Sequence, residues 1–493
     1  MKKNSMTSNI IFNFISQLIT YITPFVLSPY ISRVLLPDGV GKYSYAASIA
    51  YYFGIVIIFG FANYGTRQIA ANRENKEEYS KNFWNILVVR TIFFIISITA
   101  YISLKLIFKI PNNIEISIYM AFLLLLIGDF IDVTFLFQGL EKFKIVSIIN
   151  VVVNIFYMIS VFTLVKSPND LLYYTILKSS IKLVVSSILW LIIINKKMVE
   201  RPNNIFSKTK DTFIGSLLFF LPSLVMTISP QIDQTMISNF ANDVEGGYYQ
   251  QVQKLISLIC CLSYAIAPIM LSRITFLYQN DNEKNIQNSI SNLIYFSNFI
   301  MIPAVAGLYS ISKFFIPAYY GEAFKPAVSV MYLFLPTIIF SSIASLIING
   351  YYYPSKKVIK ATLILASTVC LNIVTNIFAI KQFGANGAAF TSTISNFISL
   401  LLLMFFSRKK LNYLRILIRS WKVTVSSVIM VLCITLITKV LIAFNVTSDI
   451  LLTIIGIVFG ILIFGITNII LREELMTKAY RILKNRVSMT KID

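Results

Sequence analysis

Five ionisable residues lie inside long apolar stretches of the sequence, where each charge needs a partner. Lys178 and Lys182 are four residues apart, Asp129 and Asp132 are three apart, and Arg90 occurs in an earlier stretch. Residues three or four apart share one face of a helix, so each pair can act on a single group. Ammonium and guanidinium groups bind phosphate, whereas paired carboxylates hold a cation or a proton. The spacing therefore predicts ionic chemistry in apolar surroundings.

The three central charges are expected at one depth in neighbouring segments that run in opposite directions. Arg90 precedes the segment that carries Asp129 and Asp132. An unpaired charge in such a segment is costly. We interpret the set as a structural group in which the carboxylates neutralise Arg90, with a site for ion or proton coupling as the alternative. Gly128, beside Asp129, is expected to let two helices approach closely.

The two lysines have no obvious carboxylate at their own level. Arg33, at the end of the first apolar stretch, adds a third positive charge to the same half of the chain. We expect Arg33, Lys178 and Lys182 to give this half a positive interior that binds a phosphorylated substrate. The alternative is that the lysines extend into water and bind nothing specific.

A second pair of charges is predicted further along the chain. Asp233 and Lys254 lie in consecutive apolar stretches, and both are expected in the outer third of their segments. We interpret them as a bridge at an outer gate.

The elements that position these residues are membrane spans. Hydrophobic residues make up 57% and charged residues only 13% of the 493 residues, and the mean hydropathy is +0.75. No soluble domain has this composition, so the sequence predicts an all-α polytopic membrane protein. Fourteen spans are expected near residues 9–35, 43–65, 83–107, 115–138, 143–165, 171–194, 211–239, 248–272, 288–311, 326–350, 358–380, 386–407, 421–444 and 449–471.

The formal charge of +22 follows from orientation in a membrane. Most of the 43 Lys and Arg residues occur at the N-terminus, in every second loop and in the C-terminal tail. This asymmetry predicts that both termini are cytoplasmic, and it removes nucleic acid as the expected partner. The sequence has no histidine, and its four cysteines lie in apolar stretches. We therefore expect no metal site, no cofactor and no enzymatic reaction.

One stretch of the sequence occurs twice. Pro24 and Pro230 lie in apolar segments 206 residues apart (230 minus 24), and each segment is followed by an Asp-x-x-Gly turn that begins at Asp38 or Asp243. Proline-interrupted segments at matching places in two halves indicate the moving helices of a transporter. We expect Pro24 and Pro230 to act as hinges.

The repeat predicts the domain organisation. Residues 1–200 form an N-lobe of six spans, residues 201–410 form a pseudo-symmetric C-lobe of six spans, and residues 411–471 add two helices. The remaining residues, 472–493, are expected to be a basic cytoplasmic tail exposed to solvent, with an amphipathic helix on the inner leaflet as the alternative.

The sequence resembles the Wzx-type polysaccharide flippases of the multidrug/oligosaccharidyl-lipid/polysaccharide exporter superfamily. The resemblance rests on the six plus six plus two arrangement of spans and on two motifs. These motifs are Ser-Arg-Val-Leu-Leu-Pro-Asp-Gly-Val-Gly-Lys-Tyr at 32–43 and Asn-Tyr-Gly-Thr-Arg-Gln-Ile-Ala at 63–70.

The resemblance implies a function. It implies a flippase that carries an undecaprenyl-diphosphate-linked oligosaccharide from the inner to the outer leaflet of the bacterial plasma membrane, by alternating access. The glycan would serve capsule, O-antigen or teichoic acid assembly, with a polymerase as a possible partner beside the lipid-linked oligosaccharide and membrane lipids. Arg33 matches the arginine that the family carries in its opening helix.

Three alternatives stay open at this stage. A flippase for peptidoglycan lipid precursors would also carry a lipid diphosphate. A drug or cation antiporter of the same fold would favour an acidic interior, and the predicted interior is basic. A glycan polymerase would need a large outer loop, and the predicted outer loops are short.

Overall fold

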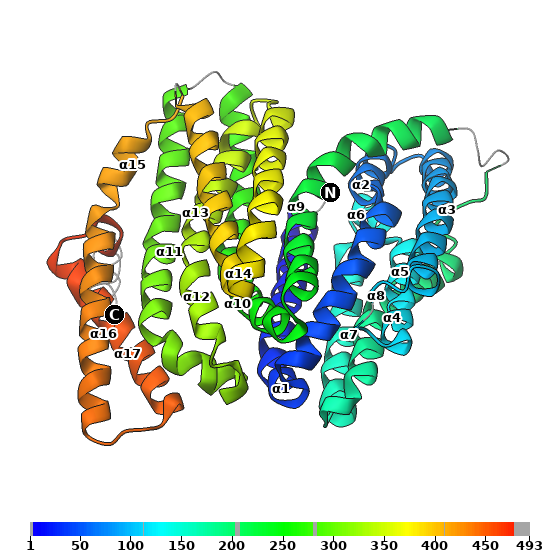
Figure 1. Cartoon of the computed structure of the whole chain (residues 1–493). Coiled ribbons are helices and arrows are strands. Elements are labelled where there is room, and N and C mark those ends of the chain that lie inside the picture. The colour runs from blue at the N-terminus through cyan, green and yellow to red at the C-terminus, as the bar shows by residue number, and fades with distance from the viewer. Residues whose placement is uncertain (1–2, 112, 203–207, 280–282, 409, 478–493) are drawn as a thin grey trace, which may run out of the picture. The chain divides into compact units, whose positions relative to one another are not determined.

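The predicted all-α membrane fold is confirmed by a computed structural model of the chain. The structure describes residues 3–111, 113–202, 208–279, 283–408 and 410–477. Within these ranges every regular element is a helix (Figure 1), and ten helices are long and apolar enough to cross a membrane. The count of fourteen spans stays a prediction.

The chain divides into two compact units, Met1–Gln250 and Gln251–Asp493. This division falls inside α10 and leaves the predicted lobe boundary near residue 200 untested. The helices of the first unit are α1 (Lys3–Ile58), α2 (Phe61–Ala71), α3 (Lys76–Leu106), α4 (Ile116–Ala121), α5 (Leu123–Phe130), α6 (Thr134–Gly139), α7 (Phe143–Leu164), η1 (Pro168–Asp170), α8 (Leu171–Asn195), α9 (Thr209–Phe240) and the start of α10 (Asp243–Gln279).

Helix α1 contains the first two predicted spans and a break between them. The break is at Leu36, whose φ of 59° and ψ of 173° are not helical. Pro37 follows directly, and a residue before proline is disfavoured in the helical conformation because the proline ring crowds its backbone. Pro24 lies within the first limb of α1, where the helix continues without a break. A hinge at Pro24 stays a prediction.

The two copies of the repeated turn lie against each other within the first unit. A Cβ added at Gly41 would lie 1.7 Å from the main-chain oxygen of Asp243, and one added at Gly247 would lie 2.1 Å from that of Pro37. Only glycine permits so close an approach of two backbones. The contact explains the motif glycine Gly41 of the first copy, whereas in the second copy the glycine in contact is Gly247, one residue after the motif glycine Gly246.

Side-chain hydrogen bonds continue this contact between α1 and α9. The Tyr45 hydroxyl donates to Oδ1 of Asn239 at 2.8 Å, while the Ser48 and Tyr52 hydroxyls bond to Thr235 at 2.9 and 2.8 Å. Asn239 stands in the second copy where Arg33 stands in the first. These bonds form a polar seam, which we define as Tyr45, Ser48, Tyr52, Thr235 and Asn239.

The second unit contains the rest of α10 and two long helical hairpins. Its other elements are α11 (Glu283–Tyr320), η2 (Glu322–Phe324), α12 (Ala327–Phe334), α13 (Pro336–Ile347), η3 (Ile348–Tyr352), α14 (Val358–Ser407), α15 (Tyr413–Arg419), α16 (Trp421–Ala443) and α17 (Asp449–Ile470). Helix α14 holds two predicted spans and breaks between them at Gly384, which has a φ of 56° and a ψ of −133°. Glycine adopts such a positive φ without the cost that a Cβ would add.

The start of the C-terminal tail differs from the prediction of a solvent-exposed end. Glu473 is fully buried and accepts a hydrogen bond from the Tyr295 hydroxyl. Arg419 donates from Nε and Nη2 to Oε2 of Glu474 at 3.0 and 2.7 Å, and its guanidinium lies 4.1 Å from the centre of the Tyr295 ring. Glu473 departs from the expected solvent exposure because α11 supplies it with a partner, whereas the Glu474 side chain is 41% exposed beside Arg419 on α15. Residues 478–493 lie outside the described residues.

The close contact at the repeated turn yields a stability prediction. We expect Gly41→Ala to lower the unfolding free energy by about 1–3 kcal/mol or more, because the new methyl overlaps a main-chain carbonyl that cannot move alone. The control is Gly307→Ala, whose added Cβ would meet its nearest atom, Cε of Met430, at an ordinary 3.7 Å. Thermal unfolding of the detergent-purified variants measures the difference, and equal midpoints would contradict the assigned contact.

Candidate functional site

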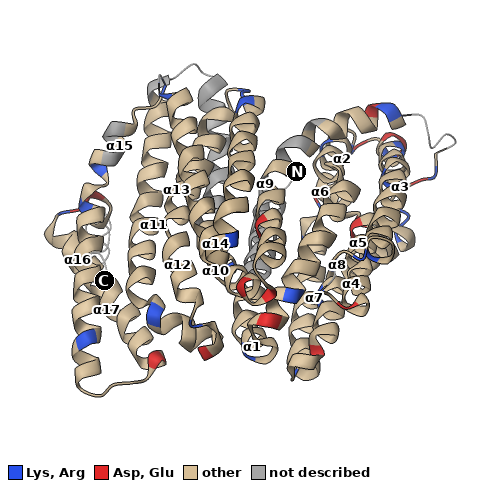
Figure 2. Ribbon diagram, in the orientation of Figure 1, with Lys and Arg blue, Asp and Glu red and all other residues tan. Residues whose placement is uncertain are grey.

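Charged residues are rare along the middle of the helices (Figure 2), and four of them meet in the first unit. Nζ of Lys182 on α8 lies 2.5 Å from Oδ1 of Asp129 and 3.2 Å from Oδ2 of Asp132. The Asp129 side chain is 5% exposed and that of Lys182 is 32% exposed, so the pair is buried on the carboxylate side and accessible on the lysine side. We call Arg90, Asp129, Asp132 and Lys182 the charge cluster.

The structure corrects the expectation that Lys182 has no carboxylate at its level. The expected depth of Asp129 and Asp132 treats residues 115–138 as one straight helix. In the structure α5 ends at Phe130 and α6 begins at Thr134, so Asp132 lies in an irregular segment. Asp129 reaches Lys182 from the last turn of α5, and Asp132 reaches it from the break itself.

Gly128 brings α5 and α8 together as predicted. A Cβ added at Gly128 would lie 2.7 Å from the backbone nitrogen of Leu183 and 3.1 Å from the carbonyl carbon of Lys182. Gly54 on α1 is equally close to the cluster, since its added Cβ would lie 2.6 Å from Oδ2 of Asp129. The backbone of α1 therefore lies close to the Asp129 carboxylate, and the backbones of α5 and α8 lie close to each other beside it.

The hydrogen bonds of Arg90 go to the backbone of the break. Its side chain is buried, and Nη1 donates to the main-chain oxygens of Asp132 at 2.5 Å and Phe130 at 3.3 Å. Nε1 of Trp190 donates to the oxygen of Ile131 at 2.8 Å. A break inside the membrane frees carbonyls that water cannot reach, so they need donors from the protein. Arg90 and Trp190 supply donors to three consecutive carbonyls.

Asp132 also caps the helix that follows the break, and two aromatic rings lie beside Arg90. Oδ1 of Asp132 accepts hydrogen bonds from the backbone nitrogen of Thr134, at 2.9 Å, and from its hydroxyl, so it caps the start of α6. The Arg90 guanidinium lies 5.5 Å from the centre of the Phe61 ring and 5.3 Å from that of Phe135. The hydrogen bonds of Arg90 go to the backbone, and its neutralisation by Asp129 and Asp132 stays a prediction. No sequence pattern marked Trp190 or Thr134.

Lys178 lies one helical turn before Lys182 and has different neighbours. Its ammonium is 5.2 Å from the centre of the Tyr157 ring on α7. In the described part of the chain no carboxylate lies within ion-pair distance of Lys178. Tyr174 on α8 packs edge-on against Tyr43 on α1, with 4.8 Å between ring centres. Lys178 is therefore a half-buried cation among aromatic rings.

Arg33 lies at a different depth from the charge cluster. It is exposed on the first limb of α1, three residues before the break at Leu36. Gly54, which touches Asp129, is 18 residues beyond this break (54 minus 36), or about 27 Å along the second limb at 1.5 Å per residue. The structure thus brings Lys182 and both aspartates together and leaves Arg33 near the break in α1.

The two residues of the predicted outer gate fall in different units. Asp233 on α9 is buried and accepts a hydrogen bond from the Tyr249 hydroxyl at 2.7 Å. Lys254 belongs to the second unit. The pairing of Asp233 with Lys254 stays a prediction, as do the hinge roles of Pro24 and Pro230.

Two relatives of this chain carry names from surface-polysaccharide transport and biosynthesis. A protein of Escherichia coli (strain K12) named "Putative O-antigen transporter" is 24% identical over 199 residues, which are 40% of this chain and 48% of the relative. The match therefore spans about half of that relative's length. The "Capsular polysaccharide biosynthesis protein CapF" of Staphylococcus aureus is 20% identical over 420 residues, which are 82% of this chain and 100% of the relative.

A solved structure supports the fold. The protein named "Lipid II flippase MurJ, inward closed conformation" superposes with a TM-score of 0.74 over 95% of this chain and 100% of its own, at 19% sequence identity. At this identity the likeness shows the fold alone.

The family match settles the relationship that the sequence motifs indicated. Residues 6–271 match the family described as polysaccharide biosynthesis protein. This confirms the resemblance to the Wzx-type polysaccharide flippases. Since the match covers more than half of the 493 residues, the chain belongs to the polysaccharide biosynthesis protein family.

Proposed function

We propose that this protein is a flippase that moves an undecaprenyl-diphosphate-linked oligosaccharide from the inner to the outer leaflet of the bacterial plasma membrane. It acts as a transporter and not as an enzyme, and both of its termini are cytoplasmic. The glycan serves capsule, O-antigen or teichoic acid assembly, where a polymerase takes it over. The family match over residues 6–271 is the observation that carries this proposal.

The diphosphate is bound by cationic residues of the first unit. Lys178 is the first candidate, because it is half-buried without a carboxylate partner among the described residues. A phosphate that leaves water gains most from a cation whose charge is not already balanced. Arg33 meets the headgroup near the break in α1, and Lys182 contributes from the exposed side of its ion pair.

The charge cluster offers a way to couple transport to an ion. A proton or cation bound at Asp129 and Asp132 weakens their hold on Lys182, because both carboxylates now share it. The freed ammonium is then available to phosphate. Ion binding and cargo binding at this place act through the same lysine, and they strengthen each other.

Alternating access moves the headgroup across the membrane while the lipid tail stays in the bilayer. The two lobes rock about their pseudo-twofold axis, with bending at Pro24 and Pro230. The polar seam between α1 and α9 consists of three hydrogen bonds between side chains. Such bonds are individually worth only about 1 kcal/mol, so a seam of this kind can open and close during transport.

Depletion of the protein tests the function. We expect lipid-linked oligosaccharide to accumulate on the inner leaflet while surface polysaccharide falls, because the glycan is still made but no longer crosses. The measurement is extraction of polyprenyl-linked glycans, with sugar analysis and a test of their accessibility from outside the cell. Accumulation of the peptidoglycan precursor would indicate a peptidoglycan-precursor flippase, and an unchanged lipid pool would reject both.

Lys178 provides a direct test of cargo binding. We expect Lys178→Gln to lower glycan export in depleted cells by about tenfold or more, since a bond between charged groups contributes about 1.5–3 kcal/mol. The control is Lys166→Gln. Lys166 is exposed between α7 and α8, where only its backbone nitrogen bonds to Asp170, at 2.9 Å. Export equal to wild type at equal protein level would remove Lys178 from the site.

A double substitution separates the two roles of Lys182. Lys182→Gln alone leaves the buried Asp129 carboxylate without its closest cation, which we expect to destabilise the protein by about 3 kcal/mol. Asp129→Asn combined with Lys182→Gln removes the unpaired charge, so the thermal midpoint should recover. If Lys182 binds cargo or Asp129 couples transport to an ion, export stays low in the double variant. Recovery of both stability and export would make Lys182 a purely structural residue.

A further inference from the structure

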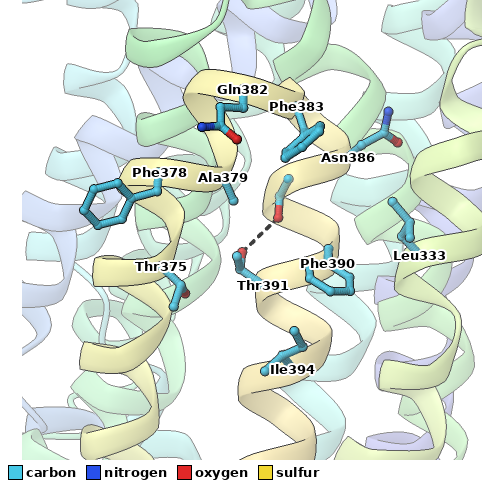
Figure 3. A pocket seen from close by; sticks show the side chains of 11 residues that line it. Leu333, Thr375, Phe378, Ala379, Gln382, Phe383, Asn386, Phe390, Thr391 and Ile394 are labelled. Atoms are coloured by element: carbon cyan, nitrogen blue, oxygen red, sulfur yellow. Dashed lines mark hydrogen bonds between the residues drawn. The ribbon is translucent and has the colours of Figure 1, made fainter.

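A groove opens in the second unit where α14 bends at Gly384 (Figure 3). Its volume is about 570 Å³. The two limbs of α14 and the end of α12 form its walls. The apolar residues that line the groove include Leu333, Phe378, Ala379, Phe383, Phe390 and Ile394.

The walls of the groove are apolar and open outward. The side chains of Phe378, Phe383 and Phe390 are 68, 63 and 52% exposed. They belong to a helix of 50 residues that is apolar enough to cross a membrane. Phenylalanine rings exposed on a membrane-spanning helix contact either hydrocarbon or the lumen of the transporter. A lumen for a sugar phosphate needs polar walls, so this groove faces lipid.

Polar groups gather at the bend. Figure 3 shows Gln382, Phe383 and Asn386 at the bend of α14, whereas Phe390 and Ile394 lie further down the second limb. Oδ1 of Asn386 is buried, and no donor reaches it among the described residues. A buried acceptor without a donor is costly, and a ligand that donates a hydrogen bond removes this cost. The exposed side chains of Lys381 and Gln382 are adjacent in sequence.

Thr391, another polar residue of the lining, already has hydrogen-bond partners within the protein. The Thr391 hydroxyl bonds to the main-chain oxygen of Gly387 at 3.0 Å and to Oδ1 of Asn376. Asn376 is fully buried and extends this bonding to Asn372. These bonds tie the two limbs of α14 together. The groove thus presents polar groups at the bend and hydrocarbon along its length.

We infer that the groove binds one acyl chain of a bilayer phosphatidylethanolamine, with the headgroup at the bend of α14. On binding, the Asn386 side chain turns toward the headgroup, so that its buried Oδ1 accepts a hydrogen bond from the ammonium, and the phosphate lies near Lys381. The volume matches a site for one molecule of moderate size, for which about 300–1,000 Å³ is usual. A polyprenyl tail has many more carbons than such a groove can cover. The inference concerns a lipid of the membrane and is independent of the proposed cargo.

The consequence of binding is support for the bent form of α14. The chain fills the space between the limbs, and the headgroup satisfies Asn386. A ligand that binds only the bent helix stabilises it by mass action. Phosphatidylethanolamine would therefore raise the thermal stability of the purified protein.

The test is photolabelling of the full-length protein in mixed micelles. The probe is phosphatidylethanolamine with a diazirine in one acyl chain, and mass spectrometry locates the label. We expect labelling within residues 375–394. Ala379→Trp fills the groove and should lower this labelling by about tenfold, because the displaced chain loses several buried methylenes. The control is Ala366→Trp, on the same limb but outside the groove, which should label like wild type.

Two further variants keep the test decisive. Leu333→Trp fills the groove from α12 and replaces Ala379→Trp if that variant does not fold. Asn386→Leu should lower labelling by about threefold or more, since the headgroup loses its acceptor. Equal labelling of wild type and filled variants, or labels spread evenly over α14, α16 and α17, would overturn the inference. Competition by a polyprenyl phosphate but not by phosphatidylethanolamine would assign the groove to the cargo tail instead.

Discussion

The interior of a membrane offers no water to an unpaired carbonyl or charge, and this constraint governs the first unit. The segment between α5 and α6 is not helical, so the carbonyls of residues 130–132 lose their partners in the helix. Arg90 and Trp190 donate to all three. Asp132 caps α6 and also accepts Lys182. A break at this depth is thus possible only with the charges that surround it.

The same constraint acts on the second unit with neutral groups. The limbs of α14 exchange hydrogen bonds among Asn372, Asn376, Thr391 and Ser392, all of them buried. Gly384 supplies the positive φ that turns the chain between the limbs. Polar side chains that bond across a hairpin hold membrane helices together where the hydrophobic effect gives no preference. Charged side chains bond to the backbone at the α5–α6 break, whereas neutral amides and hydroxyls join the two limbs of α14.

Apolar run lengths predicted most helices, but they could not locate the breaks. The spans near 143–165 and 171–194 match α7 and α8 within a residue or two, because polar residues bound them on both sides. The break at Leu36 could be read in part from Pro37. Nothing in the sequence marks residues 131–133 as irregular, and this one omission misplaced the partner of Lys182. The repeat identified Gly41, but only the fold shows that it packs against the backbone of Asp243 and that Gly247, next to the motif glycine, packs against Pro37.

The charge balance now decides which residues can make the interior positive. Within the charge cluster two cations, Arg90 and Lys182, face two carboxylates, and the sum is zero. An anion therefore gains little from Lys182 unless a carboxylate is neutralised first. Lys178 lies beside an aromatic ring and has no carboxylate within ion-pair distance in the described chain to balance its charge. The proposed positive interior therefore depends on Lys178 and on Arg33 near the break in α1.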